Sequence, residues 1–452
     1  MVRLRQAWRR ITGRHSQTGE AKSGHLVDSA TDQDVAHEFK AFFTPRNEGF
    51  PYAQVYKPLN TDTEQIRLLR LLPGDFGAPL VCELHDTVPM IDSPVKNKYQ
   101  YEAVSYCAGD AADFLSLTLN GHAFNVFRSL WEALQRFRDP GDIRVLWIDQ
   151  VCINQLDIAE RDRQVLLMKN IYENAQQVLI WLGETGPQVA EVETAFALID
   201  DFLAANKALL VKTIGAWSPV PIRTPKGLDE NTARYLSNLR WWTADHQYIP
   251  ISCKKDLMSL PGAGLVAAND LLARHDVDMA AAGFLNLTNR QWWSRCWVWQ
   301  ETLVAARPML QCGPHRVAFD DLSLVNTSFG IFDLLDFQKM QEARQDYMFG
   351  MGIGGLRLYL MRTKHLQTSD PRDKIYSLLG LFTKEERRSM GIEPNYAVSN
   401  TPADVYTLTT QAIITVEQSW DILSDIHGFY ETARLAFMGS IFCNNGRQST
   451  DL

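Results

Sequence analysis

The 452-residue sequence lacks long apolar runs, and its cysteines follow no pattern typical of a metal or disulfide site. Because no apolar run is long enough to cross a bilayer, we expect no transmembrane segment. The seven cysteines are widely spaced and include no C-x-x-C, which argues against a disulfide framework and a zinc centre. We therefore predict no metal site, reduced thiols and a cytoplasmic location, where thiols stay reduced.

A surplus of basic residues is also missing, since the formal net charge is -8. Nucleic acids and anionic membranes bind basic surfaces, so we expect neither as a general partner. The chain has no P-loop, H-E-x-x-H or G-x-S-x-G motif. "GMGIGG" (350–355) does match G-x-G-x-x-G, but a helix-like sequence rather than a strand precedes it. We therefore do not interpret it as a dinucleotide site.

The first 25 residues are rich in arginine and contain no acidic residue before Glu20. They lack the apolar core of a secretory signal. A mitochondrial presequence and an interfacial helix both fit an Arg-rich, acid-poor start. We favour the simpler interpretation, a poorly ordered basic leader.

Strand-like and helix-like patterns alternate in the middle of the chain. "YEAVSYCAGD" (101–110), "RVLWIDQVCI" (144–153) and "QVLIWLG" (177–183) are predicted strands, with helices predicted between them. This alternation predicts an α/β fold, in which helices flank a parallel sheet. Asn120-Gly121 lies inside an alternating segment and predicts a hairpin turn.

The composition of the chain suggests four regions. Residues 184 to about 288 mix Pro, Gly and charge, apart from a predicted helix at "VETAFALIDDFLAA". The predicted regions are a basic leader at 1–50, N-terminal strands at 51–98, an α/β domain at 99–305 with an insertion at about 184–288, and a mainly helical C-terminal region at 306–452.

The stretch "LWIDQVCINQLDIAERDRQ" (146–164) runs from an apolar strand into polar side chains. Ligands in open α/β sheets bind at the carboxyl ends of strands, where Asp149 lies. Asp149 either contacts a ligand there or ties down loop amides, as Asx residues often do. Asp157 and Glu160 fit a capping box, in which Asp157 accepts from an early helix amide and Glu160 reaches back. Cys152 has an apolar context and is predicted to pack in the core.

The stretch "NRQWWSRCWVWQETL" (289–303) contains four tryptophans close to arginines. Aromatic rings with arginine could stack a base or a nicotinamide ring. Packing is the simpler explanation for most of these rings. Glu301 differs, because a carboxylate among aromatic walls has a raised pKa and can act on a bound substrate.

The stretch "SDPRDKIYSLLGL" (369–381) is explained by helix boundaries. Asp370 is predicted as the N-cap, with Pro371 and Asp373 in the first turn and Gly380 as the terminator. Arg372 has no role in this scheme, and we expect it to pair with an acid.

Three blocks together resemble the heterokaryon-incompatibility (HET) domain of filamentous fungi. They are "YEAVSYCAGD", "LWIDQVCINQLDIAERDRQVLLMKNIYENAQQVLIWLG" and "NRQWWSRCWVWQE", and the resemblance covers roughly residues 55 to 400. It implies a fungal cytoplasmic protein of non-self recognition and innate immunity, which promotes regulated cell death through protein partners or self-assembly. Ala108 stands where the family usually has Trp, which leaves a degenerate, inactive copy as an alternative.

HET domains are in turn similar to Toll/interleukin-1 receptor (TIR) domains, which implies a TIR-like, flavodoxin-like sheet. TIR enzymes that cleave NAD use a glutamate in their third block, and Glu301 matches its position. The resemblance thus implies a second alternative, an NAD glycohydrolase with NAD as substrate rather than as a bound cofactor. Glu301 and Asp149 would be catalytic, and the binding residues would be Ser105, Tyr106, Gly109, Asp110, Arg295 and Trp297. Glu301 should then share a cleft with Asp149 and the 105–110 turn, and a sealed Glu301 would argue against an enzyme.

Overall fold

The computed structural model describes residues 45–90, 100–214, 241–242, 248–249, 270–329, 335–348, 355–397, 399–417 and 422. By their internal contacts these residues form two compact units. The first unit lies within Leu182–Arg290 and Met309–Met351, and the second within Gln33–Trp181, Gln291–Pro308 and Gly352–Leu452. The predicted boundaries at 50, 98 and 305 stay predictions.

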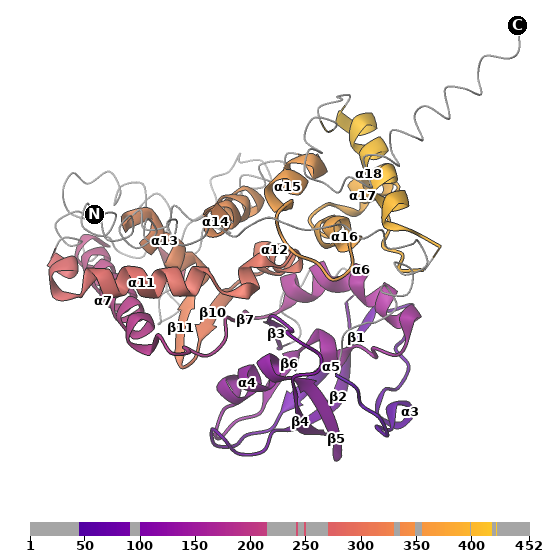
Figure 1. The fold of residues 1–452 in the computed structure, drawn as a ribbon, viewed down its shortest axis with the longest axis horizontal. Helices are drawn as coiled ribbons and strands as arrows, with labels where there is room; N and C mark the ends of the chain where they lie inside the picture. The colour runs from indigo at the N-terminus through magenta and orange to yellow at the C-terminus, as the bar shows by residue number, and fades with distance from the viewer. Residues whose placement is uncertain are drawn as a thin grey trace, which may run out of the picture. The chain divides into compact units, whose positions relative to one another are not determined.

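The second unit contains a mixed sheet (Figure 1), with strand order β7-β3-β6-β1-β2-β4-β5. β3 runs parallel to both β6 and β7, which confirms the predicted parallel centre. The sheet as a whole is mixed rather than parallel, because β1 is antiparallel to β6 and β2, and β4 is antiparallel to β5. The connections from β1 to β2 and from β4 to β5 are short, and short connections join antiparallel neighbours. The strands are β1 (Gln65–Leu71), β2 (Val81–Pro89), β3 (Glu102–Ser105), β4 (Phe114–Leu119), β5 (His122–Phe127), β6 (Arg144–Trp147) and β7 (Val178–Trp181).

The predicted hairpin is present between β4 and β5. Its two turn residues, Asn120 and Gly121, have φ values of 49° and 82°. Two consecutive positive φ angles define the type I′ turn, whose twist matches that of the flanking strands. Asparagine and glycine tolerate this conformation better than other residues, so the turn prediction is confirmed together with its cause.

The strand predicted at 144–153 is shorter in the structure. β6 ends at Trp147, and a short helix, α5 (Asp149–Cys152), follows at once. The amide of Cys152 donates to the carbonyl of Ile148 at 2.7 Å, which closes this helical turn. Asp149 therefore begins a helix beside the end of the strand, and its carboxylate accepts from the amide of Gln150 at 2.7 Å.

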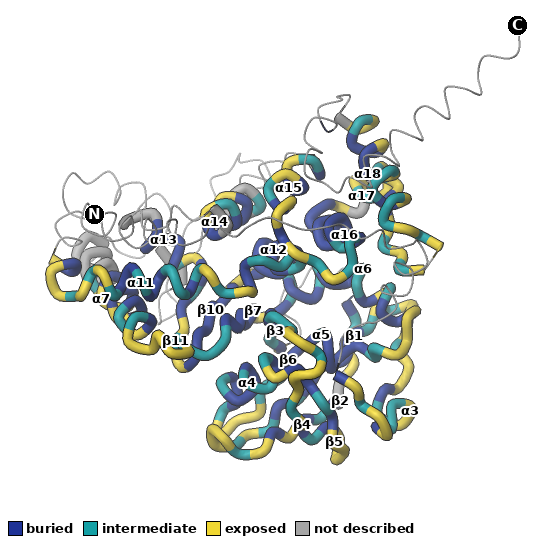
Figure 2. Tube along the Cα trace, viewed as in Figure 1, coloured by how far each residue is buried: buried dark blue, intermediate teal, exposed yellow. Residues whose placement is uncertain are grey.

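Helices of the second unit pack beside the sheet and on one another. α12 (Trp297–Leu303) contacts both α6 (Ile158–Asn174) and α16 (Asp373–Leu379), as Figure 1 shows. All residues of α16 except its first are buried, as are the last six of α12 (Figure 2). The remaining helices of this unit are α3 (Tyr52–Val55), α4 (Arg128–Phe137), the 3-10 helix η1 (Gln291–Ser294), α15 (Gly355–Thr363), α17 (Lys384–Met390) and α18 (Pro402–Glu417).

The helix predicted between the strands at 144–153 and 177–183 is confirmed as α6. Leu167, Met168, Ile171 and Tyr172 are buried on one face of it, whereas Val165 is half-buried. Tyr172 packs edge-on against Trp147 of β6, with ring centroids 5.6 Å apart. These apolar contacts fix α6 against the central parallel strands.

The first unit is mainly helical and confirms the helix predicted within the insertion, which is part of α7 (Val189–Ile214). α7 packs closely against α11 (Val277–Thr288). A Cβ at Gly283 would lie 2.0 Å from the carbonyl oxygen of Glu191, so glycine permits this close approach. The other elements of this unit are β8 (Trp241–Trp242), β9 (Tyr248–Ile249), β10 (Pro308–Cys312), β11 (His315–Ala318), α13 (Phe319–Phe329) and α14 (Leu335–Met348). Pro308, the first residue of β10, is assigned to the second unit.

Several predictions concern segments outside the described residues. These segments are residues 1–44 of the leader, the irregular stretches 218–230 and 259–265 of the insertion, and 350–354 of the "GMGIGG" match. The sequence before that match is helical, as α14, and not a strand. Among the described helices, none is both long and apolar enough to span a membrane.

Candidate functional site

The three sequence blocks meet in the second unit at the carboxyl end of β3. Ser105, the last residue of β3, donates its hydroxyl hydrogen to the carboxylate of Glu301 on α12. The indole nitrogen of Trp292, on η1, donates to the hydroxyl oxygen of Ser105 at 2.8 Å. One serine hydroxyl thus links the first block to the third through two hydrogen bonds.

Arg295 and Asp149 complete this group of polar side chains. The Arg295 guanidinium donates to the carbonyl oxygen of Tyr106 and lies within electrostatic reach of both Glu301 and Asp149. The hydroxyl of Tyr106 is hydrogen-bonded to the Asp149 carboxylate. We refer to Ser105, Tyr106, Asp149, Arg295 and Glu301 as the Glu301 cluster.

The electrostatics of the cluster bring the pKa of Glu301 close to neutral pH. Burial, with the nearby Asp149 charge, raises the pKa of Glu301 from 4.5 to about 7, although Arg295 and the Ser105 hydroxyl act in the lowering direction. Burial likewise raises the pKa of Asp149, against the lowering effect of Arg295. Burial disfavours the charge on Arg295, but the surrounding acids outweigh it and raise the pKa of Arg295. A carboxyl that titrates near 7 can hold or release a proton under physiological conditions.

Three of the five residues of the cluster are sealed from solvent, while Asp149 and Arg295 are half-buried. The exposed fractions are 3% for Glu301, 1% for Ser105 and 4% for Tyr106. The expected proximity of Glu301, Asp149 and the end of β3 is therefore present, but Glu301 is sealed, which argues against an enzyme in the form that the structure describes. Any chemistry on a ligand at Glu301 requires a form of the protein in which this carboxyl is uncovered.

Three of the predicted binding residues lie away from the Glu301 cluster. Gly109, with a φ of 83°, and Asp110 are exposed in the turn after β3. The Asp110 carboxylate accepts from the amide of Ala112 at 2.9 Å, so it stabilises the turn. Trp297 is half-buried and its indole is hydrogen-bonded to Asp373 on α16. The structure therefore brings together five of the eight predicted residues and leaves these three apart.

The other tryptophans of the third block confirm the packing interpretation. Trp292, Trp293 and Trp299 are exposed by 1%, 3% and 0%. Trp292 and Trp293 pack edge-on, with ring centroids 4.8 Å apart. These rings pack in the interior rather than present a stacking surface to solvent, and Trp292 also borders the cluster through Ser105.

The expected capping box at the start of α6 is half correct. Asp157 accepts from the amide of Glu160 at 3.0 Å, as predicted. The Glu160 carboxylate does not reach back to Asp157. It pairs with both terminal nitrogens of Arg67 on β1, at 2.5 and 2.9 Å, and accepts from the amide of Asn154 at 2.8 Å.

Sequence reasoning missed Arg67 entirely. Its signal was an arginine at an inward-facing position of an apolar strand, "IRLLRLL". Arg67 is exposed by only 4%, and a buried charge needs a partner. Besides Glu160, it donates to the carbonyls of Cys152 and Lys57 at 3.2 and 2.6 Å. This ion pair joins β1 to the start of α6.

The helix predicted after Asp370 begins later and ends differently than expected. α16 starts at Asp373, while Asp370 accepts from the amide of Arg372 at 2.9 Å in the preceding turn. Gly380 follows the helix with a right-handed φ of -65°, so no left-handed terminator is present. A Cβ there would lie 2.2 Å from the side-chain oxygen of Gln300, and close packing explains the glycine. The expected acid partner of Arg372 is Asp370, at 2.6 Å.

The described cysteines and acids form no metal site. Within the described ranges, no three His, Cys, Asp or Glu side chains gather to hold an ion. Cys82, Cys107, Cys152, Cys296 and Cys312 are free. Cys152 is buried as predicted, and burial raises the pKa of its thiol to about 12, which makes it a poor nucleophile.

The fold and the cluster define an α/β protein in which buried polar residues join three sequence blocks around a parallel centre. Residues 101–301 match the model of the heterokaryon incompatibility protein (HET) family. The chain is 26% identical over 407 residues to a Neurospora crassa protein called heterokaryon incompatibility protein 6, OR allele, covering 80% of this chain and 53% of that protein. The chain thus spans about half the length of this curated relative. No solved structure matches the chain.

The matched segment begins at Tyr101, just before β3, and ends at Glu301 itself. All five residues of the Glu301 cluster therefore lie inside the family's own boundaries. Residues 101–301 are therefore similar to a HET domain.

Proposed function

We propose that this chain is a signalling protein of fungal heterokaryon incompatibility, and that its HET domain promotes regulated cell death. The observation that carries the proposal is the meeting of the family's blocks in the Glu301 cluster, where Ser105 links Trp292 to Glu301. Polar residues are costly to bury, so a buried polar group shared between distant blocks indicates a role beyond packing. The name of the Neurospora crassa relative supports the same process.

The finer features of this proposal are a TIR-like architecture, a cytoplasmic location and action through protein partners or self-assembly. In chain order, β3, β6 and β7 are the first, second and third parallel strands, and their spatial order is second, first, third. Flavodoxin-like sheets have this order, and their ligands bind where the strand order reverses. The net charge of -8 disfavours nucleic acid as the partner.

The test of the proposed function is expression in a filamentous fungus, with cell viability as the measurement. Expression of the full chain should reduce viability, and Glu301→Gln should restore it at an equal protein level. Glu193→Gln is the matched control, because Glu193 is an exposed glutamate on α7 of the first unit. Equal killing by Glu301→Gln would exclude the cluster as the functional centre.

A second candidate function is cleavage of NAD at the bond between nicotinamide and ribose. A carboxylate beside a developing oxocarbenium ion stabilises it, and water then completes the hydrolysis. The position of Glu301 beside Asp149 and Arg295 supports this candidate, and with a pKa of about 7 the required carboxylate form predominates only above neutral pH. Because Glu301 is buried, the activity needs an assembled or opened form that uncovers it.

The two candidates separate in one assay on purified full-length protein. Incubation with NAD should release nicotinamide if the second candidate holds, and Glu301→Gln should abolish the release. Cell killing without nicotinamide release would support the signalling function and reject NAD cleavage. Ala108 stands where the family usually has Trp, so an Ala108→Trp variant that kills when the natural chain does not would identify an inactive copy.

A further inference from the structure

α16 contacts α12, the helix that carries Glu301, at both of its ends. At its beginning, the Asp373 carboxylate is hydrogen-bonded to the indole of Trp297, the first residue of α12. At its end, Gly380 lies against Gln300, the neighbour of Glu301, with no room for a Cβ. Gln300 is exposed by 2%, so it has little freedom to move away. α16 therefore holds α12 at two points four residues or less from Glu301.

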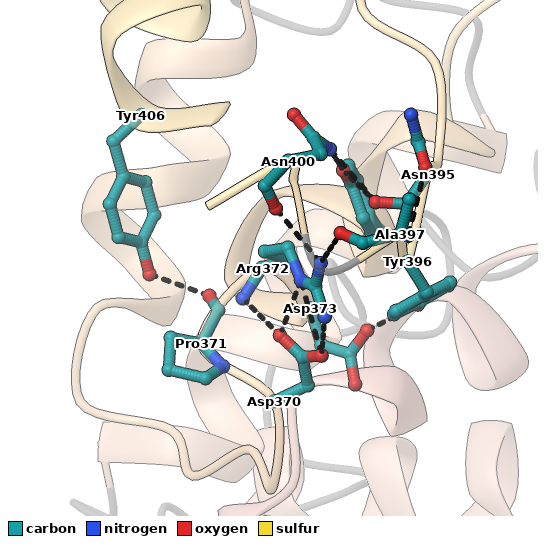
Figure 3. A network of polar contacts seen from close by, with 10 residues as sticks. Asp370, Pro371, Arg372, Asp373, Asn395, Tyr396, Ala397, Asn400 and Tyr406 are labelled. Carbon is teal, nitrogen blue, oxygen red and sulfur yellow. Dashed lines mark hydrogen bonds and ion pairs between the residues drawn. The ribbon is translucent and has the colours of Figure 1, made fainter. Parts of the chain in front are cut away.

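α16 is itself held by the connection between α17 and α18. We call this connection the strap; its described residues are 391–397 and 399–401. Arg372, just before α16, donates through one terminal nitrogen to the carbonyls of Ala397 at 3.1 Å and Asn400 at 2.9 Å (Figure 3). Its other nitrogens pair with Asp370, and its guanidinium lies over the ring of Tyr396 at 5.2 Å. One arginine thus ties the strap to the start of α16.

Tyrosines reinforce the same junction. The hydroxyl of Tyr396 in the strap donates to the Asp373 carboxylate at 2.5 Å (Figure 3). Tyr376 on α16 donates to the carbonyl of Asn395 at 3.2 Å and accepts from Asn400 at 3.0 Å. Tyr406 on α18 donates to the carbonyl of Pro371 at 2.6 Å. Asp373 is therefore the shared acceptor between the strap, through Tyr396, and α12, through Trp297.

We propose that the strap and α16 form a brace that positions α12, with Arg372, Asp373 and Tyr396 as positioning residues for Glu301. The brace keeps Glu301 sealed against Ser105, and release of the strap uncovers it. The C-terminal region then controls the access to the buried cluster of the HET domain. This inference goes beyond the proposed function and does not depend on it.

The charged groups around the Asp373 and Glu301 carboxyls set the expected response to pH. Asp373 faces Asp370, Arg372 and Tyr396, and it also influences Arg161 on α6 and Cys296 beside α12. Burial raises the pKa of Asp373 to about 6, while Tyr396 and Trp297 donate to it and lower it. The groups that face Glu301 are Arg295, Asp149, Ser105, Tyr106 and Tyr172. The two sets share no titratable group and are linked only indirectly, by Cys296, which interacts with both Asp373 and Arg295. The main route from a brace variant to Glu301 is therefore the position of α12.

The experiment follows the titration of Glu301 through Trp292, which shares the Ser105 hydroxyl with it. The full chain is labelled with 5-fluorotryptophan, and Trp292→Phe assigns the fluorine resonance. That resonance should shift with a midpoint near pH 7, the pKa of Glu301, and Glu301→Gln should abolish the shift. Arg372→Gln and Tyr396→Phe should each lower the midpoint by about one pH unit or more, because exposure removes the effect of burial.

Thr383→Ala is the matched control for lost stability. Thr383 forms a capping box with Glu386 at the start of α17, so its loss costs a helix cap but no strap contact. The midpoint of the fluorine titration in Thr383→Ala should equal that of the natural chain. Limited proteolysis within 391–401 measures release of the strap independently. An unchanged midpoint with a released strap would overturn the brace, and so would a strap that stays protected in both Arg372→Gln and Tyr396→Phe.

Discussion

Glu160 and Glu301 are both buried in the second unit, yet their surroundings differ. Glu160, exposed by 6%, receives two bonds from the Arg67 guanidinium and one from the amide of Asn154. Glu301, exposed by 3%, receives the Ser105 hydroxyl, and Arg295 acts on it from a distance. The first carboxylate has a full set of charged and polar donors, while the second does not.

We interpret this difference as the one between a structural acid and the proposed functional acid. A buried carboxylate with a bidentate arginine fixes the elements that it joins. A buried carboxyl with an incomplete set of donors gains a raised pKa, which is typical of groups that move protons or act on ligands. Both lie in blocks that resemble the HET pattern, so the resemblance by itself does not distinguish them.

The largest expected effect comes from breaking the structural pair. Arg67→Met leaves Glu160 as an unpaired buried charge, which should cost about 3–5 kcal/mol of unfolding free energy. Equilibrium urea unfolding measures the loss. Adding Glu160→Met to the same chain should recover part of it, because the stranded charge is then gone. A loss in Arg67→Met that is no larger than for an exposed arginine would contradict the assigned role.

The next largest effect is a gain in unfolding free energy, which we expect from neutralising Glu301. The pKa of Glu301 is about 7 in the folded chain against 4.5 ordinarily, so the folded state binds the proton more tightly. Stability therefore falls as the pH rises from about 4.5 to about 7 and stays low above that range. Glu301→Gln should remove this fall and stabilise the protein by about 3 kcal/mol at pH 8. Thermal unfolding measured from pH 4 to 8 tests this prediction. An equal fall of stability with pH in the natural chain and in Glu301→Gln would refute it.

A smaller loss of unfolding free energy is expected from Ser105→Ala. The change strands the Trp292 indole and the Glu301 carboxyl, both buried, and should cost about 1–3 kcal/mol. The Ser105 hydroxyl lowers the pKa of Glu301, so that pKa should also rise. Unfolding measurements at pH 6 and 8 give both quantities. Ser116→Ala, at an exposed serine of β4, is the control.

The smallest effect is expected at the start of α6. Asp157→Ala removes the side chain that accepts from the amide of Glu160, and losing such a cap costs about 1 kcal/mol. Urea unfolding should show this modest loss with the Arg67–Glu160 pair intact. A loss as large as that of Arg67→Met would mean that Asp157 and the pair act as one unit.

Local patterns in the sequence predicted the local structure well. The Asn120-Gly121 turn, the start of α6 at Asp157 and the parallel β7-β3-β6 centre followed from turn chemistry, capping and alternation. The prediction failed where partners are distant in sequence. Glu160 pairs with Arg67, 93 residues away, and Gly380 is explained only by Gln300 on another helix.

The candidate site shows the same division. The family blocks placed Ser105, Asp149, Arg295 and Glu301 in one neighbourhood, and the structure brings them together. No periodicity in the sequence encodes how deeply a side chain is covered, so the burial of Glu301 could not be predicted. The role of Trp297 was equally hidden, because its partner Asp373 lies in a different block.

The central claim, that Glu301 serves function rather than stability, is tested most directly by one paired measurement on Glu301→Gln. Unfolding free energy at pH 8 and killing on expression in a filamentous fungus are measured for the same variant, with equal protein levels. We predict a protein that is more stable than the natural chain and no longer kills. A variant that kills as well as the natural chain would contradict the claim.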